Sequence, residues 1–220
     1  MLTSNLKCCR LFAGMSDAEI EQSLQSCQAR IMPYPKNSLI FQQSDTPRLI
    51  HILLSGAVAI CKDSLAGKRT IVTTISQCGE MFGEVYVFLE KKAYDYYAVA
   101  TENASVLELP QQAFAPGDGQ AKLVHNMLFL LAEKAYFLNQ KLQIMSADSL
   151  RQKLAKLLLE NADSSGLVRL TLNREELADY LRVARPSLSR ELMKMRQEGL
   201  LTVANRQIRI SDRAGLQECL

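Results

Sequence analysis

Apolar residues recur with a helical period along one long stretch of the chain. Residues 120–146 contain neither Gly nor Pro, and apolar positions there alternate at spacings of four and three. A repeat sustained over about three heptads is typical of a helix that pairs with a second helix. We therefore predict one long helix, whose seam would join two copies of the chain through Val124, Leu128, Leu131, Ala135, Leu138, Leu142 and Met145.

The same helix carries a second apolar stripe, formed by Met127, Leu130, Phe137 and Ile144. A single stripe can simply pack into the core of its own chain, whereas two stripes need two packing partners. We expect one stripe to cover the chain's own N-terminal domain and the other to contact a second copy. The pattern favours a homodimer.

A period typical of β-structure fills the chain between residues 34 and 110. Short apolar runs alternate there with turn residues, and Ala66-Gly67 predicts a hairpin turn. Many short strands at regular spacing indicate a small antiparallel β-barrel or jelly roll. A capping box at Ser16 and Glu19 predicts a short helix before it, and the Gly and Pro residues of 115–119 end it. The predicted strands are 39–41, 49–54, 58–62, 70–75, 96–100 and 105–109.

Residues 173–201 predict two helices joined by a tight turn. The first begins with a capping box of Asn173 and Glu176 and ends at the turn 182–184. Pro186 fits only near the start of the second helix, where its missing N–H costs little. Spacings of four and three predict a buried face on the second helix, formed by Leu188, Leu192 and Met195.

The remaining C-terminal segments complete a winged helix. A polar break at 147–149 acts as a hinge, and it precedes a helix at 150–160, a strand at 167–171 and a hairpin of 200–203 with 207–210. The predicted class is α+β. The expected domains are an effector-sensing β-barrel (1–119), a long dimerisation helix (120–146) and a winged helix-turn-helix (147–220).

The net charge of +3 is unevenly spread. Residues 1–146 hold 13 basic and 13 acidic side chains, whereas residues 147–220 hold 13 basic and 10 acidic ones. Between positions 182 and 196 there are five basic residues and one acid, Glu191. Arginine can donate to O6 and N7 of guanine and serine can bond bases or phosphates, so this face suits the major groove of double-stranded DNA. A solvated amphipathic helix would explain the charge, but not the cap, turn, proline and basic face together.

The segment ELADYLRVARPSLSREL, residues 176–192, is similar to the helix-turn-helix of the Crp/Fnr family of bacterial transcription regulators. Residues 185–190 match the core of that pattern, RPSLSR, completely. Arg182 stands where the family usually has Gly, so it has to tolerate a positive φ. Ala184 stands where Ser or Thr normally caps the recognition helix, and losing such a cap costs about 1 kcal/mol.

This resemblance implies DNA contacts for named positions. The residues expected to read or position bases are Arg185, Arg190, Ser187 and Ser189. Those expected to hold phosphates are Lys194, Thr171 and, from the turn of the wing, Arg206. A two-fold dimer predicts an inverted repeat with half-sites about 10 base pairs apart. RNA polymerase is a further partner if the protein is an activator.

The resemblance extends to the cyclic-nucleotide-binding barrel of the same family, through Pro35, Asp45, LLSG at 53–56 and GEMFGE at 79–84. Gly83 lets a ligand approach the backbone. In members that bind cyclic AMP, the residue matching Glu84 contacts the ribose, and an Arg-Ser pair about ten residues later holds the phosphate.

Here those later places hold Tyr94 and Asp95. A carboxylate repels a phosphate, so an effector other than cyclic AMP is expected. Val85, beside Gly83, and Asn139, on the long helix, are the other candidate contacts. The structural alternatives stay open: Gly83 only makes a turn, Glu84 only pairs with a neighbour, and Asn139 is only a surface residue.

The composition offers little for catalysis or cofactor binding. The cysteines, at 8, 9, 27, 61, 78 and 219, show no CxxC pair and no zinc spacing, so free thiols are expected and an iron–sulfur cluster is disfavoured. His51 and His125 are expected to be satisfied structural residues. Without a nucleophile–base set, a metal cluster or a phosphate loop, we predict no enzyme, cofactor or metal site.

The chain also lacks an apolar run near the ~20 residues of a membrane span and lacks a signal peptide, so a cytoplasmic protein without a membrane partner is expected. The alternative function is a small-molecule-binding signalling module whose helix-turn-helix has decayed. Arg182 and Ala184 keep that alternative open, and binding to defined DNA separates the two.

Overall fold

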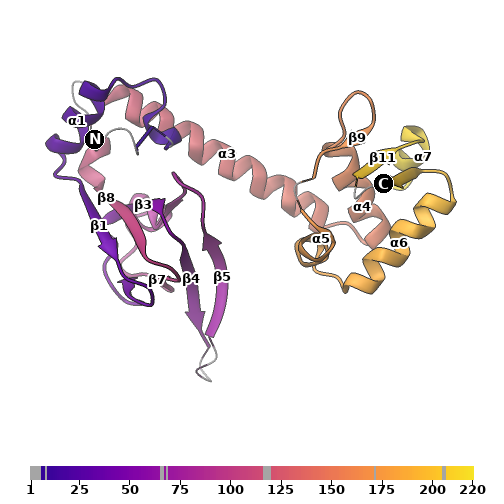
Figure 1. Ribbon diagram of the computed structural model, residues 1–220, viewed down its shortest axis with the longest axis horizontal. Helices are drawn as coiled ribbons and strands as arrows, with labels where there is room; N and C mark the ends of the chain where they lie inside the picture. Colours follow the sequence, from indigo (N-terminus) through magenta and orange to yellow (C-terminus); the bar gives the residue numbers. More distant parts are fainter. Residues whose placement is uncertain are drawn as a thin grey trace. The chain divides into compact units, whose positions relative to one another are not determined.

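The computed structural model describes Leu6, Lys7 and residues 9–64, 67, 69–115, 120–170, 172–204 and 207–220. They form two compact units, Met1–Ala132 and Glu133–Leu220. The boundary between the units falls inside helix α3 (Ala121–Met145), which is the predicted long helix. Both units combine helices with antiparallel sheet (Figure 1), so the predicted α+β class is confirmed.

Two four-stranded antiparallel sheets form the barrel of the N-terminal unit, with strand orders β1-β8-β3-β6 and β2-β7-β4-β5. Every strand predicted between residues 34 and 110 is present, and β1 and β6 are additional. The strands are β1 (Arg30–Tyr34), β2 (Leu39–Phe41), β3 (Leu49–Ser55), β4 (Val58–Asp63), β5 (Arg69–Ile75), β6 (Met81–Phe82), β7 (Tyr97–Ala100) and β8 (Ala104–Pro110).

Strand β3 is buried on both faces, because helical segments cover one face and the second sheet covers the other. Ile50 belongs to a buried cluster that includes Leu123 of α3. Leu53, on the opposite face of β3, packs with Val58 inside the barrel. Helix α1 (Asp17–Ser26) begins at the predicted capping box, in which Ser16 is the N-cap. The short helix α2 (Glu84–Phe88) was not predicted.

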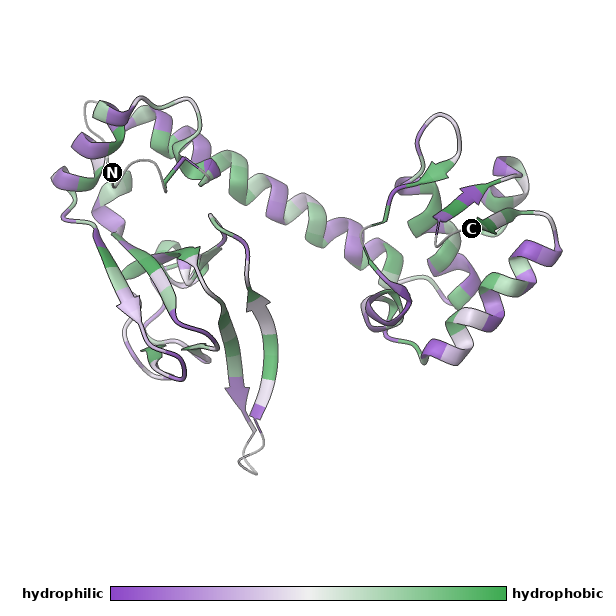
Figure 2. Cartoon of the chain, viewed as in Figure 1, coloured by the Kyte–Doolittle hydropathy of each residue, from purple (hydrophilic) through white to green (hydrophobic). Residues whose placement is uncertain are grey.

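The C-terminal unit is the predicted winged helix. Its core joins the buried faces of its helices and hairpin, for example Leu154, Leu181, Leu188 and Ile208. The wing sheet has the order β10-β11-β9, and α6 shows alternating hydrophilic and hydrophobic positions in Figure 2. Strand β9 is shorter than predicted, and α7 was not predicted. The elements are α4 (Leu150–Glu160), β9 (Leu167–Val168), α5 (Arg174–Leu181), α6 (Arg185–Gln197), β10 (Leu201–Ala204), β11 (Gln207–Ile210) and α7 (Arg213–Gln217).

Helix α3 leaves much of its heptad seam in contact with solvent in the single chain. Leu128, Leu138 and Leu142 are 62%, 58% and 65% exposed, and Ala135 is exposed as well. The other seam residues, Val124, Leu131 and Met145, are half-buried.

We expected each apolar stripe of α3 to have a single packing partner, but the second stripe contacts both units of the chain. Met127 lies in a core of the N-terminal unit, whereas Ile144 lies in the core of the C-terminal unit and Phe137 is exposed. The expectation is wrong because the helix runs out of one unit and into the other.

Among the described cysteines, one departs from the expected free thiols. Cys9, Cys27, Cys61 and Cys219 form no disulfide, but Cys78 is disulfide-bonded. Disulfide bonding depends on how close the fold brings two sulfur atoms, which sequence spacing does not reveal. Cys8 lies outside the described residues. Among the residues that are described, no group of three or more His, Cys, Asp or Glu side chains could hold a metal ion. No helix in that part of the chain is long and apolar enough to cross a membrane.

Candidate nucleic-acid interface

The start of α5 is fixed by the predicted capping box. The side-chain oxygen of Asn173 accepts from the amides of Glu175 and Glu176, at 2.9 and 3.0 Å. The Glu176 carboxylate accepts in return from the amide of Asn173, at 2.7 Å. Donors that the first turn of a helix would otherwise leave unpaired are therefore satisfied.

The turn between α5 and α6 has the strained geometry that the sequence implied. Arg182 adopts the left-handed conformation, with φ 54° and ψ 48°. The amide of Val183 donates to the carbonyl of Ala178 at 2.9 Å, which closes the end of α5 around this residue. Ala184 is the N-cap of α6 and supplies no side-chain hydrogen bond. Both departures from the family pattern are thus tolerated, and the two helices keep their predicted bounds.

Helix α6 is held by its buried face and by its C-terminal turn. Leu188, Leu192 and Met195 are at most 3% exposed, as their spacing predicted. At the other end Gly199 has a φ of +80°, and the amide of Leu200 donates to the carbonyl of Met195 at 3.0 Å. This pattern is a Schellman motif, which needs the left-handed residue that Gly supplies at little cost.

The outward side of α6 presents the predicted DNA-binding residues to solvent. Exposed there are Arg185, Ser187, Ser189, Arg190 and Lys194. Thr171 and Arg206 lie outside the described residues. Every described residue for which the resemblance implied a DNA contact is therefore accessible.

The acids of α6 are engaged by one arginine of α4. The Nε atom of Arg151 donates to Glu191 at 2.7 Å, and its two terminal nitrogens donate to Glu198 at 2.6 and 2.9 Å. These hydrogen bonds lower the pKa of Glu198 and raise that of Arg151. Because Arg151 offsets one of their two negative charges, Glu191 and Glu198 oppose an approaching polyanion less than two free carboxylates would.

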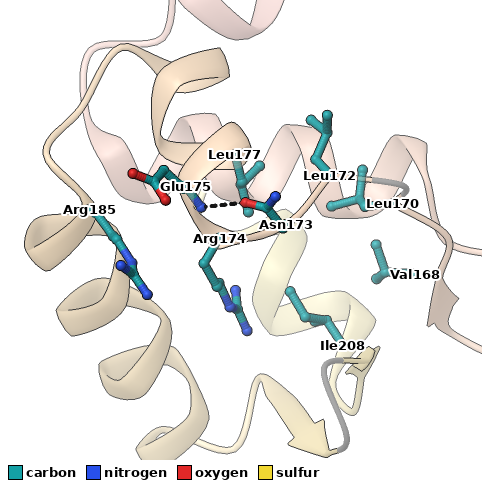
Figure 3. Close-up of a pocket in the computed structure, with 9 residues that line it drawn as sticks. All are labelled: Val168, Leu170, Leu172, Asn173, Arg174, Glu175, Leu177, Arg185 and Ile208. Carbon is teal, nitrogen blue, oxygen red and sulfur yellow. Dashed lines mark hydrogen bonds between the residues drawn. The ribbon is translucent and has the colours of Figure 1, made fainter.

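A pocket of about 610 Å³ opens beside the start of α5. Its floor is apolar, and Arg174 and Arg185 supply its positive charge. In Figure 3 both guanidinium groups extend toward the same opening, and the Glu175 carboxylate is directed away from it. The Nη1 atom of Arg174 is buried without a hydrogen-bond partner in the described part of the chain, and burial lowers the pKa of Arg174. An unpaired donor beside a helix N-terminus suits an anion such as a phosphate.

Arg174 was absent from the residues that the sequence predicted for DNA binding. A signal was available, because a cation at the first position of a helix opposes the helix dipole and is disfavoured unless it serves another contact. Its buried, unpaired nitrogen depends on the packing of α5 against the wing, which the sequence pattern does not show.

The candidate effector residues of the barrel differ in their exposure to solvent. Gly83 caps α2 with a φ of +83°, and a side chain there would approach Tyr94 and His51 to 3.2 and 3.3 Å. Glu84 is 4% exposed, whereas Val85 is 48% exposed. Gly83 therefore serves both the turn and the close approach of two side chains.

Tyr94 lies in the aromatic core of the barrel. It is buried and stacks on Phe41 with ring centroids 4.0 Å apart, and burial raises its pKa to about 12. Asp95 is exposed and accepts from the Tyr86 hydroxyl and, at 2.9 Å, from Lys62. These two contacts, the one from Tyr86 foremost, lower the pKa of Asp95. Asn139 is an exposed residue of the C-terminal unit.

The two histidines differ. His51 is a buried ring that stacks on Phe82, and burial lowers its pKa to about 4. Its Nδ1 atom has no hydrogen-bond partner among the described residues, so the expectation of a satisfied histidine is wrong at this atom. A nitrogen can be stranded when ring packing decides the position of the side chain. His125 is exposed.

A barrel of this type joined to a winged helix-turn-helix defines a class of DNA-binding regulator. Residues 31–116 match the family model of the cyclic nucleotide-binding domain, and residues 152–219 match that of the Crp-like helix-turn-helix domain. The chain belongs to the Crp/Fnr family of transcription regulators. The family consists of transcription regulators rather than enzymes, and DNA is the partner of its helix-turn-helix.

Similar proteins cover nearly the whole chain. The cyclic AMP receptor protein of Thermus thermophilus is 26% identical over 209 residues, which are 94% of this chain and 95% of that protein. The transcriptional regulator LdrP of the same organism is 29% identical over 190 residues, 84% of this chain and 93% of its own length.

Two solved structures share the fold. The crystal structure of the Thermus thermophilus catabolite activator protein has a TM-score of 0.52 at 24% identity and covers 96% of this chain and 97% of its own. CprK in complex with OCPA has a TM-score of 0.61 at 14% identity, covering 92% and 93%.

Proposed function

We propose that this regulator is a cytoplasmic homodimer that reads an inverted repeat in DNA with the outward side of α6. The observation that carries the proposal is the chemistry of that side. Arg185, Arg190 and Lys194 are exposed, while the acids of the helix are engaged by Arg151. Arg185 and Arg190 would read guanine edges, and Ser187 and Ser189 would read or position neighbouring bases.

Phosphate contacts would come from the flanks of this surface. Lys194 is exposed on α6, and Arg174 lines the pocket beside α5, where its buried Nη1 atom has no hydrogen-bond partner among the described residues. Thr171 and Arg206 are proposed from the sequence alone. Such contacts fix the register of the protein on the duplex and carry no sequence information.

Dimerisation is supported by the exposed apolar seam of α3. Leu138 and Leu142 are more than half exposed in the single chain, which is costly for two leucines on a regular heptad. A parallel pairing of two α3 helices would cover them. We keep the division into a sensing barrel (1–119), a dimerisation helix (120–146) and a reader (147–220).

The effector is proposed to be a small molecule other than cyclic AMP. Tyr94 is packed into the barrel core, and the next residue, Asp95, carries a carboxylate. Neither residue can supply the guanidinium fork that holds a cyclic phosphate. An activator would also contact RNA polymerase.

The decayed-reader alternative loses support from the same geometry. Arg182 and Ala184 weaken the turn, yet α5 keeps its capping box and α6 keeps its buried face and its Schellman motif. A signalling module without DNA binding would have no need for an exposed donor face on α6.

Selection of bound duplexes from a random-sequence library tests the proposal. We expect the unmodified protein to enrich an inverted repeat and Arg190→Ala to lose the enrichment. Arg213→Ala is the matched control, because it removes an exposed arginine from α7, which packs on α4. Sedimentation of the same samples gives the oligomeric state. Equal enrichment by the Arg190→Ala variant would contradict the proposed reading of bases, whereas a folded dimer that enriches no duplex would point to a missing effector or to the decayed reader.

A further inference from the structure

Two apolar side chains lie on the outward side of α6 among its basic and hydroxyl groups. Met193 is 50% exposed and Pro186 is exposed as well. At 3.6 residues per turn, positions 186, 190 and 193 fall on one line along a helix. That line lies opposite Leu188, Leu192 and Met195, which are buried. Met193 and Pro186 therefore occupy the middle of the surface that faces a groove, with Arg190 between them.

Among the described residues, the same surface of α6 presents no carboxylate that is free to accept a hydrogen bond. Reading cytosine in the major groove requires an acceptor for its N4 amino group, which Glu or Asp usually supplies. Glu191 of α6 and Glu198, the C-cap of that helix, are both bonded to Arg151. Arginine and lysine donors, serine hydroxyls that donate or accept, and apolar groups are left to meet the bases.

Major-groove chemistry pairs each of these groups with a particular base. Arginine donates to the O6 and N7 atoms of guanine, and apolar side chains contact the C5-methyl group of thymine. We propose that Met193 and Pro186 are specificity-determining residues that contact thymine methyl groups on either side of the guanine read by Arg190. This inference rests on the proposed function of α6 as the DNA reader.

The helix geometry sets the spacing of the two thymines. Seven residues separate Pro186 from Met193, which at 1.5 Å per residue is about 10 Å along the axis. With a rise of about 3.4 Å per base pair, this length spans at most about three base-pair steps. Each half-site is therefore expected to hold a guanine flanked by two thymines no more than about three steps apart.

Deoxyuridine substitution isolates the methyl groups, because uracil differs from thymine only by lacking the C5-methyl. Each thymine of the selected duplex is replaced in turn, and binding is measured by fluorescence anisotropy at fixed salt. For the unmodified protein we expect about 4-fold weaker binding at each contacted position, which corresponds to the ~0.8 kcal/mol of one buried methyl group. Met193→Ala should remove the penalty at one position and keep it at the other, and Met193→Leu should retain both.

The outcomes distinguish a failure of the methyl contacts from a failure of the DNA reader. If Arg190→Ala selects the same duplex as the unmodified protein, the proposed DNA reader fails and this inference falls with it. If a duplex is selected but deoxyuridine changes nothing, or if the penalties are the same in Met193→Ala, the methyl contact is refuted and the DNA reader stands. Met193 is exposed, so its truncation leaves the core of α6 intact.

Discussion

Replacing Arg151 with methionine is expected to destabilise the winged helix, because the three hydrogen bonds of its guanidinium group are lost. The guanidinium joins α4 to α6, with nitrogen–oxygen distances of 2.7 Å to Glu191 and of 2.6 and 2.9 Å to Glu198. Methionine preserves most of the aliphatic stem, so the Arg151→Met variant removes mainly the charge and its hydrogen bonds.

The expected cost follows from the exposure of the three side chains. Arg151 and Glu191 are 27% and 21% exposed, so this pair is only partly screened, whereas Glu198 is 37% exposed. Fully exposed pairs contribute about 0–1 kcal/mol, and hydrogen bonds to charged groups away from water about 1.5–3 kcal/mol. With a discount for the exposure of Glu198, we expect a loss of about 2 kcal/mol in the free energy of unfolding. For a unit of this size that corresponds to a fall of about 10 °C in Tm.

Denaturant unfolding followed by circular dichroism, at one fixed protein concentration, measures this loss. Arg169→Met is the matched control, because Arg169 pairs with Asp163 at 3.2 Å while its side chain is 76% exposed. We expect the control to cost less than about 0.5 kcal/mol. A double-mutant cycle of Arg151→Met with Glu191→Gln should show a coupling of about 1 kcal/mol. Equal losses for the two arginines, together with a coupling near zero, would refute the reasoning.

Three further predictions follow from local geometry. In denaturant unfolding, the Ala184→Thr variant should be more stable than Ala184→Val by only about 0.5 kcal/mol. A threonine hydroxyl would find few free amides to cap, because Pro186 has no amide hydrogen and the amide of Ser187 already donates to the Ala184 carbonyl at 2.9 Å. Because burial lowers the pKa of His51 to about 4, the unfolded chain binds a proton at this residue at a higher pH than the folded chain does. The N-terminal unit should therefore lose up to about 3 kcal/mol as the pH falls from about 6.5 to 4, and urea titrations should show a flatter dependence for His51→Phe. Arg174→Ala should weaken binding evenly across sequences and reduce the slope of log K against log salt by about 1, unlike Arg213→Ala, in anisotropy titrations.

The helices of the C-terminal unit could be predicted from local sequence patterns. A capping box involves residues three apart, so Asn173 and Glu176 define the start of α5 without help from the rest of the chain. The buried face of α6 follows from the helical period alone. The pattern missed β1 because it contains Pro33, which fits an edge strand, and its residues are at most half-buried. It missed β6 because two residues show no period.

Features that depend on tertiary contact could not be predicted in the same way. Glu191 counts as one more charge in the sequence, and only the packing of α4 against α6 pairs it with Arg151. Arg174 gains its buried, unpaired nitrogen from the wall of a pocket. Tyr94 stacks on Phe41 in the barrel core, a contact between distant parts of the chain that the sequence pattern does not show.

The engagement of Glu191 and Glu198 by Arg151 also bears on how quickly the regulator would find its target. A helix face that shows donors and no free carboxylate attracts any stretch of duplex, because the phosphate charge is the same everywhere. The protein would land at random along a chromosome and then slide, so the time needed to reach an operator would be set largely by travel along the DNA. Raising the ionic strength would shorten each sliding run. A carboxylate released on α6 would slow the search even at a site whose bases it never touches.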